Sequence, residues 1–395
     1  MSAKRYIGRC IGISSAVLGA CVAALGWGIA RKLTAPVGPR TFNLVIRDIE
    51  DRGDRLRIVL DRTRDTEAVG IYNLWFENGG WVQLDDDVQD HGTDQVSRTI
   101  TGCSAGLTPR AGDRVSWSGI YFATPTDAGL EDRDVKISTA GGYAPSWKVD
   151  GDPSTWAIHI HGLGSTRAGT LRGVQVATEL GYTSLVVSYR NDGEGPRVGT
   201  GRSTLGVTEV DDVEAAIGYA VRCGAERIVL FGWSMGAAIA LQIAHRPPHG
   251  PLVAGLVLDS PVLNWSAAIE TNCRRAGLPR NAGVLTTPWL TKRLLARALG
   301  LSSAVQLNEM NWIEHASKLS VPMLILHGSR DDSVPLRVSE LLRDRRPDVV
   351  TLEVFDAGHT LSWNSHSERW RRSVAEWLFV VQAGCRTPGS LRLNG

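Results

Sequence analysis

The chain has 395 residues, of which 43% are hydrophobic and 21% charged, and its formal net charge at pH 7 is +2. This composition is typical of a folded globular protein and excludes a disordered chain. The length allows one large domain and something smaller beside it. The net charge is near zero, and no basic stretch with interspersed aromatic residues occurs in the sequence. The sequence therefore gives no reason to expect a nucleic-acid partner.

Residues 11–30 form an uncharged, largely apolar run with basic residues on both sides. A run of about 20 such residues spans a bilayer as a helix. We therefore predict a transmembrane signal anchor at 11–30 and a single-pass protein of the cell membrane. The alternatives are a cleaved signal peptide and the lipoprotein signal that residues 18–21 resemble, but the run is longer than a usual signal peptide core.

A short linker at 34–40, rich in Pro and Gly, leads into a β-rich N-terminal module that we place at 41–149. Apolar stretches in this module alternate with turns that contain Gly and Asp. The sequence Asn78-Gly79-Gly80 between two aromatic runs predicts a β-hairpin. The acidic run at 85–87 is interpreted as a solvated loop, because a calcium loop would add a matching glycine and a bidentate glutamate.

From residue 150 to 383 predicted strands alternate with amphipathic helices, which favours an α/β domain. Val210, Val213, Ile217 and Val221 recur at helical spacing and give one apolar face to a helix at 209–222. Such alternation predicts a doubly wound, mostly parallel sheet with helices on both faces. The stretch at about 262–319 has no strand pattern, and we expect a small helical cap there, over the functional site.

The sequence Gly232-Trp233-Ser234-Met235-Gly236 follows an apolar strand and precedes a helix-forming run. Strand, tight turn and helix with a serine at the apex are what a nucleophile elbow requires. The two glycines allow the turn to be tight, because neither carries a side chain that would collide with the backbone. A serine nucleophile also needs a base, and the base needs an orienting carboxylate.

Candidates for the acid and the base lie in loops after later strands. Asp331 and Asp332 follow one predicted strand, and His359 follows the next. Ligand sites of open α/β sheets lie at the carboxyl ends of the strands, where these loops begin. Asp259 also ends a strand, and its alternative role is to cap or brace a loop. His366 stands at an apparent helix start, where we expect a solvated side chain.

With these motifs the chain resembles the α/β-hydrolase family over roughly 140–383. The resemblance is to the serine-esterase and prolyl-oligopeptidase-like branch, and within it to membrane-anchored hydrolases of actinobacteria. The stretches that carry it are 156–162, 187–194, 231–236, 258–263 and 357–360. It implies a catalytic triad of Ser234, Asp331 and His359, because the family spacing His-Gly-x-x-Asp-x-x-Val-Pro favours Asp331 over Asp332. The N–H groups of Leu163 and Met235 would then form the oxyanion hole.

The resemblance implies a hydrolase but no particular substrate, because this fold hosts many activities. We expect it to cleave a small-molecule or lipid carboxylic ester through an acyl-enzyme, without cofactor or metal. We expect its catalytic domain outside the cytoplasm. Alternatives are a peptidase or amidase, an acyltransferase on the same triad, or a binding protein on an inactive scaffold. His159 and His161 share a strand face, but no third residue at metal-ligand spacing accompanies them. The sequence leaves the oligomeric state open.

Overall fold

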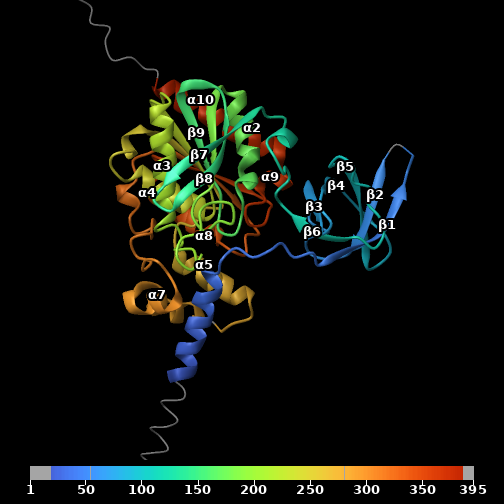
Figure 1. Cartoon of the computed structure of the whole chain (residues 1–395), viewed down its shortest axis with the longest axis horizontal. Helices are drawn as coiled ribbons and strands as arrows, with labels where there is room; N and C mark the ends of the chain where they lie inside the picture. The colour runs from blue at the N-terminus through green and yellow to red at the C-terminus, as the bar shows by residue number, and fades with distance from the viewer. Residues whose placement is uncertain (1–18, 54, 280, 386–395) are drawn as a thin grey trace, which may run out of the picture.

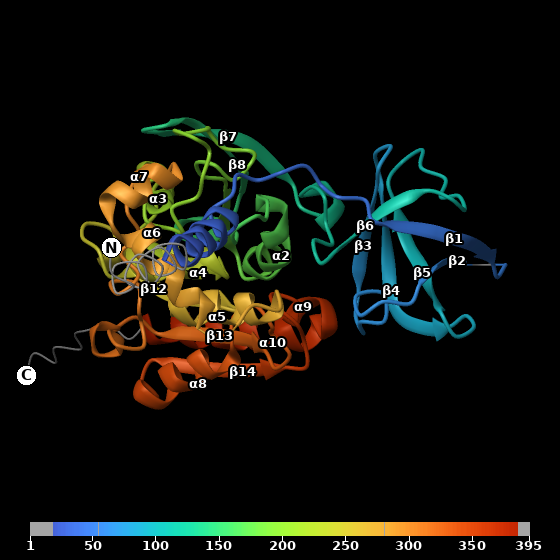
Figure 2. The same cartoon turned by 90° about the horizontal axis from the view of Figure 1, so that it is seen from below.

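The computed structural model describes residues 19–385 except for 54 and 280. It contains a β-barrel and a larger α/β domain (Figure 1). In both views the barrel stands at one side of the α/β domain, next to α9 (Figures 1 and 2).

The barrel closes in the strand order β1-β2-β5-β4-β3-β6. Its strands are β1 (Leu44–Asp51), β2 (Leu56–Asp61), β3 (Tyr72–Phe76), β4 (Trp81–Asp90), β5 (Gln95–Cys103) and β6 (Arg114–Ser118). Alternate side chains fill the interior, among them Ile58, Leu60 and Leu74, all completely buried. The predicted hairpin at Asn78-Gly79-Gly80 is confirmed, because β3 and β4 pair antiparallel on either side of it. The acidic run at 85–87 lies within β4, where Asp87 forms an ion pair with Arg57.

The α/β domain is built on an eight-stranded sheet in the order β14-β13-β12-β11-β9-β10-β8-β7. Its strands are β7 (Asp132–Thr139), β8 (Gly142–Val149), β9 (Asp152–Ile160), β10 (Tyr182–Val187), β11 (Arg227–Trp233), β12 (Val253–Asp259), β13 (Met323–Gly328) and β14 (Val350–Phe355). The run from β14 to β10 is parallel, whereas β8 pairs antiparallel with both β10 and β7. The predicted module at 41–149 thus extends too far, since β7 and β8 complete the sheet of the second domain.

Helices cover both faces of this sheet, as doubly wound folds require. The helices are α2 (Leu171–Glu179), α3 (Glu209–Arg222), α4 (Met235–Ala244), α8 (Leu336–Arg345), α9 (Ser362–Ser365) and α10 (Ser367–Cys385). Buried residues of α3, α4 and α8 share one core cluster, and those of α2 and α10 share another. Val210, Val213 and Ile217 of α3 are completely buried, whereas Val221 in its last turn is exposed.

The chain between β12 and β13 carries α5 (Trp265–Arg275), α6 (Thr287–Thr291) and α7 (Arg293–Leu299). Helix α5 begins after Asn264, whose side chain accepts a hydrogen bond from the Ala267 N–H group and caps the helix. Trp265, Leu290 and Leu299 are buried and extend the core cluster that contains α4.

The prediction of a transmembrane anchor at 11–30 needs correction. In the part of the chain that the structure describes, no helix is both long and apolar enough to cross a membrane. Residues 11–18 lie outside the described residues, and 19–33 are helical. One side of this helix packs on the cap: Ala30 is buried, and the Ala23 carbonyl accepts a hydrogen bond from Trp289 at 3.1 Å. The predicted single-pass location in the cell membrane depended on this anchor and is withdrawn with it.

The barrel is joined to the α/β domain at Asn364 of α9. The Asn364 side chain donates to the carbonyl oxygens of Ile71 and Gly119, at 2.8 and 3.0 Å, and the Asn364 backbone carbonyl oxygen accepts from the Ile71 N–H group at 2.9 Å. An ion pair of 2.6 Å between Arg64 and Asp332 adds a second link. The residue before β3 and the residue after β6 are thereby held against the edge of the sheet where the candidate site lies.

His159 of β9 provides a test of this core. Its ring is completely buried against Phe231, and burial lowers the pKa of His159 from 6.5 to about 3. Between these two pH values the unfolded chain binds a proton at this ring that the folded chain does not, so stability falls as the pH falls. From pH 7 to pH 5 we expect wild type to lose about 2 kcal/mol of unfolding free energy that His159→Leu does not lose.

Urea denaturation at the two pH values measures this difference. His245 is exposed, and a His245→Leu variant serves as the control that keeps the wild-type pH dependence. Equal losses in wild type and His159→Leu would contradict a neutral buried ring.

Candidate active site

The candidate nucleophile Ser234 occupies the sharp turn between β11 and α4. Its backbone has φ 52° and ψ −111°, a conformation that costs free energy for a residue with a side chain. The flanking glycines are required by close backbone contacts. A Cβ atom at Gly232 would lie 2.5 Å from the Cα of Ala237, and one at Gly236 would lie 2.1 Å from the carbonyl oxygen of Ile160. The turn therefore holds Ser234 at the carboxyl edge of the sheet.

The structure brings Ser234, His359 and Asp331 into one hydrogen-bonded chain. The His359 Nε2 atom lies 2.9 Å from Ser234 Oγ, and its Nδ1 atom lies 2.7 Å from Asp331 Oδ2. A carboxylate only accepts, so the Nδ1 atom carries the proton and Nε2 is free to accept from the serine hydroxyl. The His359 side chain is 23% exposed, while that of Asp331 is completely buried.

Both carboxylate oxygens of Asp331 have partners. Its Oδ1 atom accepts from the backbone N–H groups of Ser333 and Val334, at 2.9 and 2.8 Å. Its Oδ2 atom also lies 3.3 Å from Nε2 of His327. Burial alone raises the pKa of Asp331, but the hydrogen bonds and charges of His327 and His359 hold that pKa well below its usual range. The carboxylate is therefore ionised at neutral pH.

His327, which is not among the predicted site residues, is a further partner of the candidate acid. It is buried on β13, and its Nδ1 atom lies 2.8 Å from the hydroxyl of Ser339 on α8. The signal that could have identified it is its position as the first residue of the His-Gly-x-x-Asp motif, four residues before the candidate acid.

The side chains of the alternative candidates for the acid and the base have partners other than Ser234, His359 and Asp331. Asp332 accepts from Arg64 of the barrel at 2.6 Å and from Arg275 of α5 at 3.1 Å. Asp259 is buried, which raises its pKa, and its Oδ2 atom accepts from the indole N–H of Trp370 at 3.0 Å. His366 lies between α9 and α10 with its ring near Phe355.

The loop that follows β9 lies against the serine turn. A Cβ atom at Gly162 would stand 3.0 Å from the carbonyl oxygen of Trp233 and 3.1 Å from the Cβ of Ser234. The glycine thus permits the close approach. Leu163 follows directly, Met235 is the first residue of α4, and the two residues line one small cavity.

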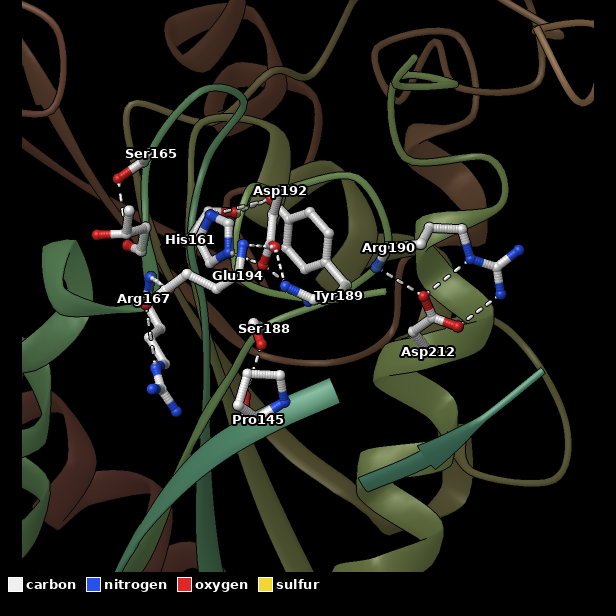
Figure 3. Close-up of polar contacts among 12 residues, drawn as sticks. Pro145, His161, Ser165, Arg167, Ser188, Tyr189, Arg190, Asp192, Glu194 and Asp212 are labelled. Atoms are coloured by element: carbon white, nitrogen blue, oxygen red, sulfur yellow. Dashed lines mark hydrogen bonds and ion pairs between the residues drawn. The ribbon is translucent and has the colours of Figure 1, made fainter. Parts of the chain in front are cut away.

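A buried polar cluster holds the loop that follows β9 in place (Figure 3). The Nε2 atom of His161 lies 3.0 Å from Asp192 Oδ2, and the Tyr189 hydroxyl donates to the His161 carbonyl oxygen at 2.9 Å. Asp192 also accepts from the N–H groups of Tyr189, Glu194 and Gly195, at 2.9, 2.8 and 2.6 Å. Burial alone raises the pKa of Asp192, but its hydrogen bonds and the charge of His161 lower it. His161 therefore braces the loop.

Arg190 points away from this cluster and makes two hydrogen bonds to Asp212 of α3, at 2.8 and 2.5 Å (Figure 3). Together with the contacts of Asp192, this assigns a bracing role to the charged loop after β10. In the described part of the chain, no group of three or more His, Cys, Asp or Glu side chains is placed to hold a metal ion.

A cavity of about 180 Å³ lies beside Ser234 and His359. The loop of Gly162 and Leu163 forms one wall, and Arg172 of α2 and Trp233 form another. Gly119 and Ile120, which follow the last barrel strand, also line it. The residues that line it include none from 262–319, so the described part of the predicted cap does not close this cavity. A second cavity of about 600 Å³ lies between the barrel and the α/β domain and also reaches His359.

The brace under the loop predicts a large effect of Asp192→Leu. The substitution removes the acceptor of the buried Tyr189 N–H group and of the N–H groups of Glu194 and Gly195, whose bonds to Asp192 are partly buried. It also removes the partner of the buried His161 ring, so we expect the free energy of unfolding to fall by about 3 kcal/mol or more. Chemical denaturation measures this change. Asp211 has a side chain 57% exposed, and its replacement by Leu should change stability by less than about 0.5 kcal/mol. Similar effects of both substitutions would contradict the bracing role.

Comparisons with known proteins find matches to both the barrel and the α/β domain. A domain family of unknown function (DUF8805) matches residues 45–118, the strands of the barrel. The human protein ABHD12B is 29% identical over 251 residues, which are 61% of this chain and 63% of that protein. The match therefore spans less than two thirds of ABHD12B. The uncharacterized protein YqkD of Bacillus subtilis is 22% identical over 58% of this chain and 72% of its own length.

Among solved structures, the esterase Pf2001 of Pyrococcus furiosus is similar with a TM-score of 0.51 and 22% identity, over 66% of this chain and 96% of that chain. At this identity the likeness establishes the fold. A family model described as the alpha/beta hydrolase family matches residues 157–376, more than half of the chain. The resemblance found in the motifs is thus confirmed, and the chain belongs to the alpha/beta hydrolase family.

Proposed function

We propose that the protein is a serine hydrolase that cleaves a carboxylic ester with Ser234, His359 and Asp331 as its catalytic triad. The observation that carries this proposal is the continuous hydrogen-bonded chain from Asp331 through His359 to the hydroxyl of Ser234. The family membership and the likeness to a solved esterase support a hydrolase of the ester-cleaving kind.

The chemistry follows from this arrangement. His359 accepts the hydroxyl proton while Ser234 attacks the ester carbonyl, and Asp331 stabilises the imidazolium that forms. The Leu163 and Met235 N–H groups are proposed to hold the negative oxygen of the tetrahedral intermediate. His359 then protonates the leaving alcohol, and water cleaves the acyl-enzyme.

Two cavities reach His359, and we propose that one holds the acyl part of the ester and the other its alcohol part. The smaller cavity, which also contains Ser234, suits a short group.

Substitutions at the triad distinguish Asp331 from Asp332 as the catalytic acid. We expect Ser234→Ala to lower kcat by roughly 10⁴–10⁶-fold and Asp331→Asn by roughly 10⁴-fold. Asp332→Asn is the matched control, since Asp332 pairs with Arg64 and Arg275, and it should keep kcat within about threefold of wild type. Near-full turnover in Ser234→Ala, or a larger loss in Asp332→Asn than in Asp331→Asn, would contradict the assignment.

Labelling with a fluorophosphonate probe tests the nucleophile without knowledge of the substrate. We expect wild type to be labelled and both Ser234→Ala and His359→Ala to remain unlabelled, because the probe reacts with an activated serine. Hydrolysis of a library of short acyl esters then tests the reaction itself. A folded wild-type protein that is not labelled would favour an inactive scaffold.

A further inference from the structure

Arg172 is a buried cation in the wall of the cavity that contains Ser234. It lies on α2, only 7% exposed, and lines the cavity together with Trp233 and His359. Its guanidinium stands 5.7 Å from the centre of the Trp233 ring, and one of its terminal nitrogens donates to the Asn364 side chain at 2.9 Å.

This cation has too few partners for its burial. Its Nε atom is buried and, among the described residues, has no hydrogen-bond acceptor. A buried charge normally lies in an ion pair, because leaving it unpaired in a medium of low polarity costs several kcal/mol. Arg190, by comparison, makes two hydrogen bonds to Asp212. Of the described carboxylates, none forms an ion pair with Arg172.

The charge of Asp259 acts on Arg172, but the two side chains form no hydrogen bond or ion pair with each other. One oxygen of Asp259 accepts from Trp370, and the other is buried and has no hydrogen-bond partner among the residues that the structure describes. Burial lowers the pKa of Arg172 and raises that of Asp259, so the two groups remain poorly compensated in the absence of a ligand. An anion in the cavity would supply the missing partner.

We propose that Arg172 binds a carboxylate of the substrate, so that the preferred esters are short and carry a negative charge. The proposal deepens the proposed function and rests on it. A guanidinium suits this role because its planar donors match a carboxylate. The cavity of about 180 Å³, with a cation in its wall, suits a short polar group better than a long hydrocarbon chain.

Another role for Arg172 is to position the barrel, since Asn364 links it to the carbonyl oxygens of Ile71 and Gly119. The two roles predict different outcomes. A structural residue would affect charged and neutral esters alike, whereas an anion-binding residue affects their ratio. Asn364→Ala is the matched control, because it removes the barrel contact and keeps the cation.

The experiment compares esters that differ only in a carboxylate. Monoethyl succinate against ethyl butyrate places the charge on the acyl side, and 4-(butyryloxy)butanoate against butyl butyrate places it on the alcohol side. In wild type we expect a higher kcat/KM for the charged ester of one pair. In Arg172→Met that advantage should fall by about 10- to 100-fold, with kcat/KM of the neutral ester within about threefold.

The same advantage should persist in Asn364→Ala and in part in Arg172→Lys, which keeps a positive charge. A wild type that prefers the neutral ester of both pairs would overturn the proposal, and this measurement needs no variant to fold. Equal losses for charged and neutral esters in Arg172→Met would overturn it as well.

A binding measurement separates this proposal from the proposed function. Calorimetric titration of succinate and of 4-hydroxybutanoate into Ser234→Ala does not depend on catalysis. Binding of either anion that is lost in the Ser234→Ala, Arg172→Met double variant supports the role of Arg172, even if no ester is hydrolysed. Absence of binding in Ser234→Ala, or equal binding in both variants, would overturn it.

Discussion

The site depends on the close contact between the turn that carries Ser234 and the end of β9. A Cβ atom at Gly236 would lie 2.1 Å from the Ile160 carbonyl oxygen, and one at Gly162 would lie 3.0 Å from the Trp233 carbonyl oxygen. This contact holds the serine in a conformation with positive φ. Because the turn and the loop of Leu163 touch, the proposed nucleophile and one proposed oxyanion donor share one rigid support.

The two carboxylate oxygens of Asp331 have separate partners, and this separation makes the acid loop stable. One oxygen accepts from two backbone N–H groups of its own loop, and the other faces His359 and His327. The first set fixes where the carboxylate lies, and the second keeps it ionised although its side chain is completely buried. At Asp192 the division is only partial: one oxygen accepts from the Glu194 and Gly195 N–H groups, and the other faces His161 and also accepts from the Tyr189 N–H group.

The barrel takes part in the site through the segments that leave it. Gly119 and Ile120 line the cavity beside Ser234, and residues 64–72 line the larger cavity that reaches His359. Asn364 joins these segments to α9, and Arg172 joins Asn364 to the cavity wall. A domain without recognised function thus borders both places where the parts of an ester are proposed to bind.

Local sequence determined much of this protein: the nucleophile turn from its two glycines, the strands and helices from their periodicity, and the candidates Ser234, Asp331 and His359 from their positions after strands. These features depend on neighbours in the chain, so a sequence shows them. The prediction of a membrane span at 11–30 was wrong, because hydropathy does not distinguish a span from a helix such as the described residues 19–33, which pack on the cap. Only the tertiary structure placed β7 and β8 in the large sheet, turned Asp332 toward Arg64, and set Arg172 beside Ser234. Each of these depends on partners distant in the chain, and their contacts form only when the whole sheet has assembled.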